Sequence, residues 1–122
     1  QHLREQPLGL TLKGPEDLRQ QLAGLGGDLC VEYFHNPSEC DIFHTGVNKL
    51  TGLRAVLRRE DIPVEACVAF GDGGNDRELL GAAGCGVAMG NACAAAKAAA
   101  KYVCACSWED GIYTFLRRMA LI

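Results

Sequence analysis

The hydrophobic positions of residues 46–122 fall into short apolar runs that are separated by stretches with helical spacing. The apolar runs lie at residues 66–70, 86–89 and 102–106. The helical spacing recurs at residues 48–59, 75–83, 92–100 and 109–120. Short strands without polar alternation are typical of parallel sheets whose two faces are covered by helices. This pattern therefore predicts an α/β fold built on a parallel sheet.

The first part of the chain has a different pattern, which predicts a β-α-β-β unit. Pro15 lies in the first turn of the expected helix and Gly24 ends it. The last two strands flank a turn of Asn36, Pro37 and Ser38, which favours a hairpin. The expected strands are residues 8–13, 29–35 and 40–44, and the expected helix is residues 15–24.

A group of candidate functional residues follows the apolar run 66–70, where the sequence reads Gly-Asp-Gly-Gly-Asn-Asp. Asp72 and Asp76 leave the carboxyl end of this strand, the edge where open α/β sheets bind ligands. Neighbouring carboxylates repel each other, and Mg²⁺ relieves the repulsion because it takes oxygen ligands. An ordinary turn is the alternative, since turns favour these residue types. An EF-hand does not fit, because its closing Glu is absent.

Several motifs resemble the C-terminal part of a Cof-type (class IIB) phosphatase of the haloacid dehalogenase (HAD) superfamily, and they occur in the family's order. They are Gly71–Asp76, Glu78–Gly84, Gly86–Ala92 and Glu109–Ile112. Upstream, Gly46–Leu53 resembles the segment that carries the family's essential lysine, with Leu50 where the family usually has glycine. The resemblance is close over residues 40–122 and looser over residues 8–40.

The resemblance implies both a fold and an activity. Residues 46–122 are expected to form the later half of a HAD-like, Rossmannoid core with a parallel sheet. Residues 1–45 are expected to form the C-terminal portion of a C2-type α+β cap. The implied activity is the Mg²⁺-dependent hydrolysis of a small phosphate ester, with a small phosphorylated metabolite as substrate.

The resemblance also implies roles for four residues. Asp72 ligates Mg²⁺, and Asp76 ligates it or orients its waters. Asn75 donates hydrogen bonds to the phosphate, and Lys49 bridges the phosphate and the nucleophile. The residues alone leave simpler interpretations open: Lys49 as a solvated lysine at a helix start, and Asn75 as a helix cap.

The Asp-x-Asp-Gly segment that carries the family's nucleophile is missing from these 122 residues. Asp28 follows glycines instead of an apolar strand, and Asp41 has no second acid two residues later. We therefore expect the chain to be inactive alone. It is a truncated phosphatase, a non-catalytic protein that binds metal or phosphate, or one half of a two-chain enzyme. Strand 66–70 is expected to lack a neighbour, so we expect self-association or pairing with the missing N-terminal half.

Composition argues against nucleic-acid and membrane partners and indicates a reducing compartment. The net charge of −3 gives no nucleic-acid footprint, and no apolar run reaches membrane-spanning length. The first residues do not resemble a signal segment, and the seven cysteines are interpreted as reduced thiols of a cytoplasmic protein. Cys104 and Cys106 are expected to share one face of a strand. A metal site there is disfavoured because no second Cys or His pair has zinc spacing.

Three further features are interpreted structurally. Gly84–Gly90 contains a G-x-G pattern, but its glycines bracket a strand instead of joining a strand to a helix, which argues against dinucleotide binding. His35 and His44 are expected to be strand or turn residues, not catalysts. Trp108 is expected to pack against the sheet or to precede the cap of the last helix.

Overall fold

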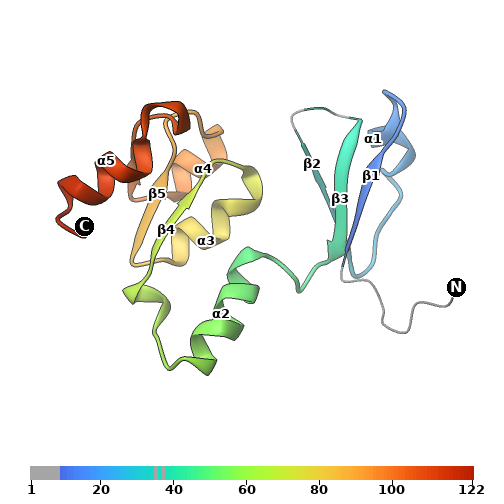
Figure 1. The fold of residues 1–122 in the computed structure, drawn as a ribbon. Helices are drawn as coiled ribbons and strands as arrows, with labels where there is room; N and C mark the ends of the chain where they lie inside the picture. Colours follow the sequence, from blue (N-terminus) through green and yellow to red (C-terminus); the bar gives the residue numbers. More distant parts are fainter. Residues whose placement is uncertain (1–8, 35, 37) are drawn as a thin grey trace, which may run out of the picture. The chain divides into compact units, whose positions relative to one another are not determined.

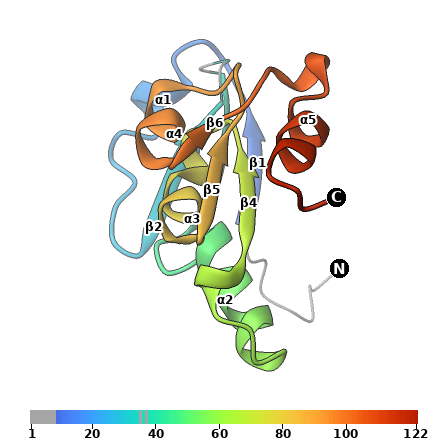
Figure 2. The ribbon, with the colours of Figure 1, turned by 90° about the vertical axis from the view of Figure 1, so that its left-hand side faces the viewer.

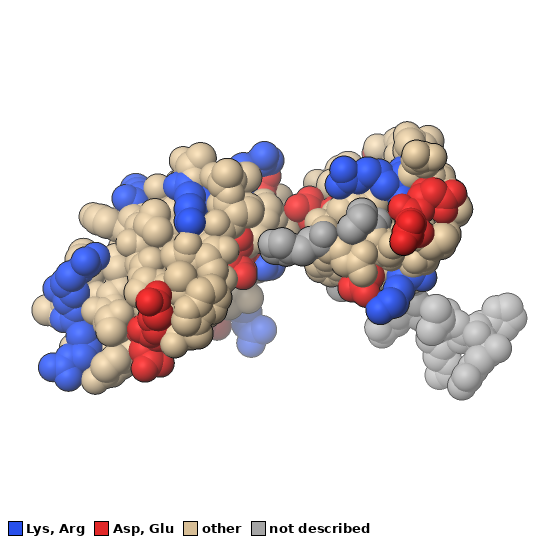
Figure 3. All heavy atoms as spheres, turned by 90° about the horizontal axis from the view of Figure 1, so that it is seen from above, with Lys and Arg blue, Asp and Glu red and all other residues tan. Residues whose placement is uncertain are grey.

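The computed structural model describes residues 9–34, 36 and 38–122, so the predictions for Leu8, His35 and Pro37 lie outside the described residues. The chain divides into two compact units, Gln1–Val47 and Asn48–Ile122 (Figure 1). Within the part of the chain that is described, no helix is both long and apolar enough to cross a bilayer. On the face that Figure 3 shows, each unit carries basic and acidic side chains among uncharged surface.

The first unit is a three-stranded antiparallel sheet with one short helix. Its elements are β1 (Gly9–Lys13), α1 (Leu18–Gln21), β2 (Leu29–Tyr33) and β3 (Glu39–His44), and the strand order is β1-β3-β2. Leu18 of α1 packs against Cys40 and Ile42 on one face of the sheet. The predicted strands and hairpin are confirmed. The helix is shorter than the expected residues 15–24, since Leu18 is its one buried residue and isolated short helices are marginal.

The second unit contains a three-stranded parallel sheet in the order β4-β5-β6. Its strands are β4 (Val68–Gly71), β5 (Cys85–Ala88) and β6 (Tyr102–Val103). Its helices are α2 (Lys49–Arg59), α3 (Arg77–Ala82), α4 (Ala94–Ala99) and α5 (Gly111–Arg118). Three short 3-10 turns are η1 (Val64–Ala66), η2 (Gly74–Asp76) and η3 (Ser107–Glu109).

Helices cover both faces of the parallel sheet, as the apolar runs predict (Figures 1 and 2). On one face, Leu80 of α3 and Ala96 of α4 are fully buried against Ala69 and Ala88 of the strands. On the other face, the ring of Phe115 in α5 lies edge-on to Phe70 of β4, with ring centroids 5.8 Å apart. These contacts fix the strand ends from which the functional residues project.

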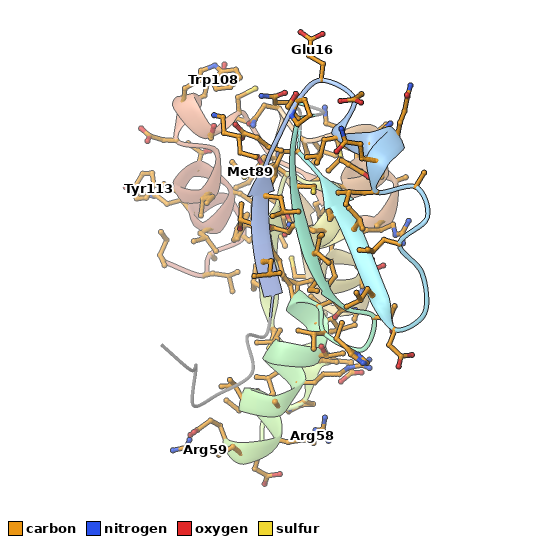
Figure 4. All side chains as sticks on the ribbon, turned by 90° about the vertical axis from the view of Figure 1, so that its right-hand side faces the viewer. Glu16, Arg58, Arg59, Met89, Trp108 and Tyr113 are labelled. Carbon is orange, nitrogen blue, oxygen red and sulfur yellow. The ribbon has the colours of Figure 1, made fainter. Side chains whose placement is uncertain are left out.

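Three details differ from the sequence-based expectations. The last strand ends at Val103 instead of residue 106, so the expectation that Cys104 and Cys106 share one face of a strand is wrong. The strand expected at 66–70 begins at Val68, because Val64–Ala66 form a 3-10 turn. Trp108 lies in η3 before α5 with 75% of its surface exposed, so it precedes the helix and does not pack on the sheet (Figure 4).

Candidate functional site

The carboxyl end of β4 carries two acidic residues in contrasting environments. Asp72 follows the strand directly and is exposed, whereas Asp76 lies at the end of η2 with 3% of its surface exposed. Among the described residues, Asp76 is the one buried charged residue. A buried carboxylate needs compensating partners, so its contacts indicate how the site is built.

Three donors surround the Asp76 carboxylate. Its Oδ2 accepts hydrogen bonds from the backbone N–H groups of Asp72 at 2.9 Å and Gly73 at 3.0 Å. Its Oδ1 is paired with the ammonium group of Lys49. Burial by itself raises the pKa of Asp76, but the hydrogen bonds from Lys49, Gly73 and Asp72 outweigh it and hold the pKa below its ordinary value. Asp76 is therefore ionised at neutral pH.

The close approach of Asp76 to β4 requires glycine at the end of the strand. A Cβ at position 71 would lie 2.5 Å from the Asp76 Cβ, which no side chain can accommodate. The glycine-rich sequence thus has a steric reason here, beyond the preference of turns for glycine. It lets the turn fold back so that Asp76 reaches the amides of Asp72 and Gly73.

Lys49 is brought to this site by the start of α2. Asn48 caps the helix: its Oδ1 accepts from the Thr51 amide at 2.8 Å, and its own amide donates to Thr51 Oγ1 at 2.9 Å. This reciprocal capping box fixes the first turn, in which Lys49 is the first helical residue. Lys49 Nζ lies 3.5 Å from Asn75 Oδ1 and pairs with Asp76, although 27 positions separate Lys49 from Asp76 in the sequence.

Asp72 is held differently, through its backbone. Its N–H donates to Asp76, and its carbonyl oxygen accepts from the Cys93 amide at 2.9 Å. Within the described residues, no hydrogen bond or ion pair engages its exposed carboxylate. The backbone is therefore fixed while the carboxylate is available to an external ligand.

The donor set fits one kind of metal. No group of three or more His, Cys, Asp or Glu in the described part of the chain is arranged to hold an ion. A single available carboxylate suits Mg²⁺, which commonly binds through one or two carboxylates and keeps several waters. Both oxygens of Asp76 already have protein partners. Of the two carboxylates at this strand end, that of Asp72 is therefore the one open to a cation.

The four residues that the sequence singles out are thus not equivalent. The structure brings Lys49, Asn75 and Asp76 into contact, and it places the Asp72 carboxylate on the same strand end without a contact to them. Sequence reasoning missed the capping box of Asn48 and Thr51, although an acceptor followed three residues later by a hydroxyl resembles such a motif. It also missed Cys93, whose backbone amide leaves no signal in the side-chain pattern.

A family profile, a curated relative and solved structures all match this chain, and all are hydrolases or phosphatases. A family profile described as haloacid dehalogenase-like hydrolase matches residues 10–116. The 5-amino-6-(5-phospho-D-ribitylamino)uracil phosphatase YitU of Bacillus subtilis (strain 168) is 44% identical over 77 residues, which are 63% of this chain and 28% of YitU.

Two solved structures resemble the fold. BT1666 from Bacteroides thetaiotaomicron, studied among phosphatases of the haloalkanoate (HAD) superfamily, has a TM-score of 0.83 at 33% identity, covering 98% of this chain and 44% of that chain. The HAD subclass IIB sugar phosphatase BT4131 has a TM-score of 0.80 at 33% identity, and the match covers 94% of this chain and 44% of BT4131. The chain therefore spans less than half the length of these relatives.

Proposed function

We propose that this chain, which belongs to the haloacid dehalogenase-like hydrolases and to their Cof-type (class IIB) branch, provides the cation- and phosphate-binding part of a phosphatase site. The reaction is the Mg²⁺-dependent hydrolysis of a small phosphate ester. The observation that carries the proposal is the cluster of Lys49, Asn75 and Asp76 beside the available carboxylate of Asp72. A fixed ammonium, an amide and a carboxylate at one strand end are suited to binding a phosphate together with its cation.

The two units receive different parts in this proposal. We assign residues 46–122 to the later half of the core and residues 1–45 to the C-terminal portion of a C2-type cap. The parallel sheet of the second unit, the antiparallel sheet of the first and the division after Val47 support the assignment. So does the match to about half of each related structure.

Each site residue has a distinct role. Asp72 holds the Mg²⁺ ion, which when bound stabilises negative charge on the phosphoryl oxygens. Lys49 donates to a phosphate oxygen, and its ammonium offsets charge that develops during transfer. Asn75 donates its amide N–H to the same phosphate. Asp76 positions Lys49, because one of its oxygens is bonded to the Lys49 ammonium while the other is held by backbone amides.

The nucleophile has to come from elsewhere in the proposed enzyme. Covalent phosphoryl transfer needs an activated carboxylate, and these 122 residues contain no Asp-x-Asp segment. We propose that residues outside this sequence supply it, from the same polypeptide or from a partner chain. The 122 residues alone should therefore leave p-nitrophenyl phosphate intact. The second candidate, a non-catalytic protein that binds metal and phosphate, is favoured by the same missing segment.

The proposal includes the substrate class and the compartment. YitU is named for a phosphorylated ribitylaminouracil and BT4131 is called a sugar phosphatase, so a small phosphorylated metabolite is the proposed substrate. All seven cysteines are free thiols. This supports the cytoplasm, where thiols stay reduced.

A partner strand is also part of the proposal. Among the described residues, β4 pairs with β5 alone, so its other edge carries unpaired backbone groups. Val68 on this strand is 39% exposed. Open edges of this kind recruit other strands, so we propose self-association or pairing with the segment that carries the nucleophile. Sedimentation over a concentration series tests it, and a compact monomer throughout would contradict it.

Phosphate binding tests the proposed site. Inorganic phosphate with Mg²⁺ is titrated calorimetrically into the chain and into Lys49→Met and Lys101→Met variants. Lys101 is a matched control, because its ammonium also has a protein acceptor, the carbonyl of Gly84 at 2.8 Å. We expect Lys49→Met to weaken phosphate binding by about tenfold or more, as for loss of a charged hydrogen bond. Equal affinities for the two variants would contradict the assignment.

A further inference from the structure

The loop Gly90–Cys93, which follows β5, supports the backbone of the proposed cation site. The amide of Met89 donates to the carbonyl of Gly71 at 2.9 Å, and the amide of Cys93 donates to the carbonyl of Asp72 at 2.9 Å. The Cys93 bond joins the end of β4 to this loop, and the Met89 bond joins it to the residue just before the loop. The direction of the Asp72 carboxylate therefore depends on where the loop lies.

Two side chains hold this loop in place. Lys97 of α4 donates from Nζ to the carbonyl of Gly90 at 2.6 Å. Asn91 accepts with Oδ1 from the amide of Ser107 at 3.0 Å, which ties the loop to η3. The backbones also pack tightly, since a Cβ on Gly90 would lie 2.8 Å from the amide nitrogen of Cys106.

Neither side chain is bonded to Lys49, Asp72, Asn75 or Asp76. Asn91 belongs to the motif Gly86–Ala92, which resembles the family but has no chemical role in the proposed reaction. Its hydrogen bond to Ser107 gives this part of the motif a physical function. Lys97 reaches back from the last turn of α4 to the same loop.

We propose that Asn91 and Lys97 are positioning residues for the cation site, because they clamp the Gly90–Cys93 loop and through the Cys93 amide fix the position of Asp72. The inference rests on the proposed function in one respect, that Asp72 is the cation ligand. Displacement of a ligand by even about 1 Å weakens a site of this kind, so contacts that support a ligand also affect the affinity for the ion.

The chain contains a control for the Lys97 contact. Lys101 makes the same type of bond, from Nζ to the Gly84 carbonyl at 2.8 Å, but Gly84 precedes β5 whereas Gly90 follows it. Removing either ammonium deletes one exposed hydrogen bond to a backbone carbonyl. Only the Lys97 bond lies in the loop after β5 whose Cys93 amide bonds to Asp72.

The test uses the full chain and five variants. Lys97→Met and Asn91→Ala remove the clamp, Lys97→Arg and Asn91→Asp keep the donor and the acceptor, and Lys101→Met is the control. Two quantities are measured for each: the hydrogen-exchange rate of the Cys93 amide by NMR, and the dissociation constant for Mg²⁺ by calorimetry. The melting temperature is recorded to compare general destabilisation.

The clamp predicts a specific pattern. In Lys97→Met and Asn91→Ala, we expect Cys93 exchange to accelerate by about fivefold to tenfold and Mg²⁺ binding to weaken by about threefold to tenfold, as for loss of one hydrogen bond. Lys97→Arg and Asn91→Asp should restore both. Lys101→Met should leave both within about twofold of the parent chain, even where its melting temperature falls equally.

Other outcomes would overturn the inference. If the exchange rate of the Cys93 amide is unchanged in Lys97→Met and Asn91→Ala, these residues do not clamp the loop. The same conclusion follows if Lys101→Met changes that rate equally. If the Cys93 amide exchanges faster but the affinity for Mg²⁺ is unchanged, Asn91 and Lys97 hold the loop without positioning the cation site. If the parent chain takes up no Mg²⁺, the proposed function fails, and the clamp stands or falls on the exchange rates alone.

Discussion

The two units differ in how much buried apolar surface supports them. In the first unit, the buried hydrophobic residues of the described chain are Leu18, Cys40 and Ile42, and the helix is a single turn. The second unit has ten buried hydrophobic residues, in its strands, helices and loops: Leu57, Ala69, Leu80, Ala83, Val87, Ala88, Met89, Ala92, Ala96 and Phe115. The proposed chemistry depends on the second unit, whose larger core holds the strand ends rigidly.

The units also differ in how they form tight turns. Among the described residues of the first unit, Gly27 has a positive φ, of 79°, and glycine adopts this conformation without strain. The second unit places Asp61, Asp110 and Ala120 in the left-handed region, with φ between 52° and 55°. Non-glycine residues are disfavoured there, so the second unit tolerates local strain that its core offsets.

The largest expected effect comes from truncating the core that carries the site. Leu80 is fully buried between α3 and the sheet, and we expect Leu80→Ala to destabilise the second unit by about 3 kcal/mol. Ile42→Ala should instead melt the first unit and leave the Lys49–Asp76 pair intact, because the hydrogen bonds of that pair among the described residues all come from residues 48–122. Amide exchange resolved by residue distinguishes the two. Loss of protection at Asp76 in both variants would contradict the separation.

A smaller loss is expected when the buried carboxylate loses its partner. Lys49→Met leaves the ionised Asp76 with two backbone donors and no counter-charge. We expect a loss of about 2 kcal/mol, below the range for fully buried pairs because half of the Lys49 side chain is exposed. Chemical denaturation measures it, with Lys101→Met as the matched control. Equal losses in the two variants would mean that the pair adds nothing to stability.

The same pair makes stability depend on pH. The pKa of Asp76 is lower in the folded chain than its ordinary value, so its contribution is fully present above about pH 4 and is lost as the pH falls through the folded pKa. The difference in unfolding free energy between the parent chain and Asp76→Asn should be constant from pH 7 to about pH 5 and should shrink below pH 4. If this difference in unfolding free energy grew as the pH fell, the pKa of Asp76 would be raised by folding and not lowered.

The smallest effect concerns the strained turn after α5. Ala120 has φ of 54°, and the Leu121 amide bonds to the carbonyl of Leu116 at 3.0 Å, as at helix ends that usually carry glycine. We expect Ala120→Gly to stabilise the chain by about 1 kcal/mol. Ala100→Gly is the control, because Ala100 ends α4 with φ of −79°, where glycine brings no relief. A gain in both, read from thermal melting, would show that strain is not the cause.

The hydrophobic pattern predicts the parallel sheet well because its three strands read as short apolar runs, and the central strand β5 is the most deeply buried of them. It fails where length depends on packing: α1 stops after one turn, and β6 pairs over two residues instead of five. The strand end that carries Asp72 and Asp76 follows from the pattern and from glycine spacing. The partnership of Lys49 with Asp76 does not, because a bond across 27 residues has no local signature. The family resemblance brought Lys49 to the site as the bridge between the phosphate and the nucleophile, and it did not pair Lys49 with Asp76.

Mg²⁺ binding through Asp72 tests the central claim most directly. Mg²⁺ is titrated calorimetrically into the parent chain, into Asp72→Asn, and into Glu65→Gln, which removes an exposed carboxylate from η1 before β4. Loss of the single available carboxylate at the strand end should abolish the binding heat in Asp72→Asn, while Glu65→Gln should bind as the parent does. Equal heats for the parent chain and Asp72→Asn would contradict the account.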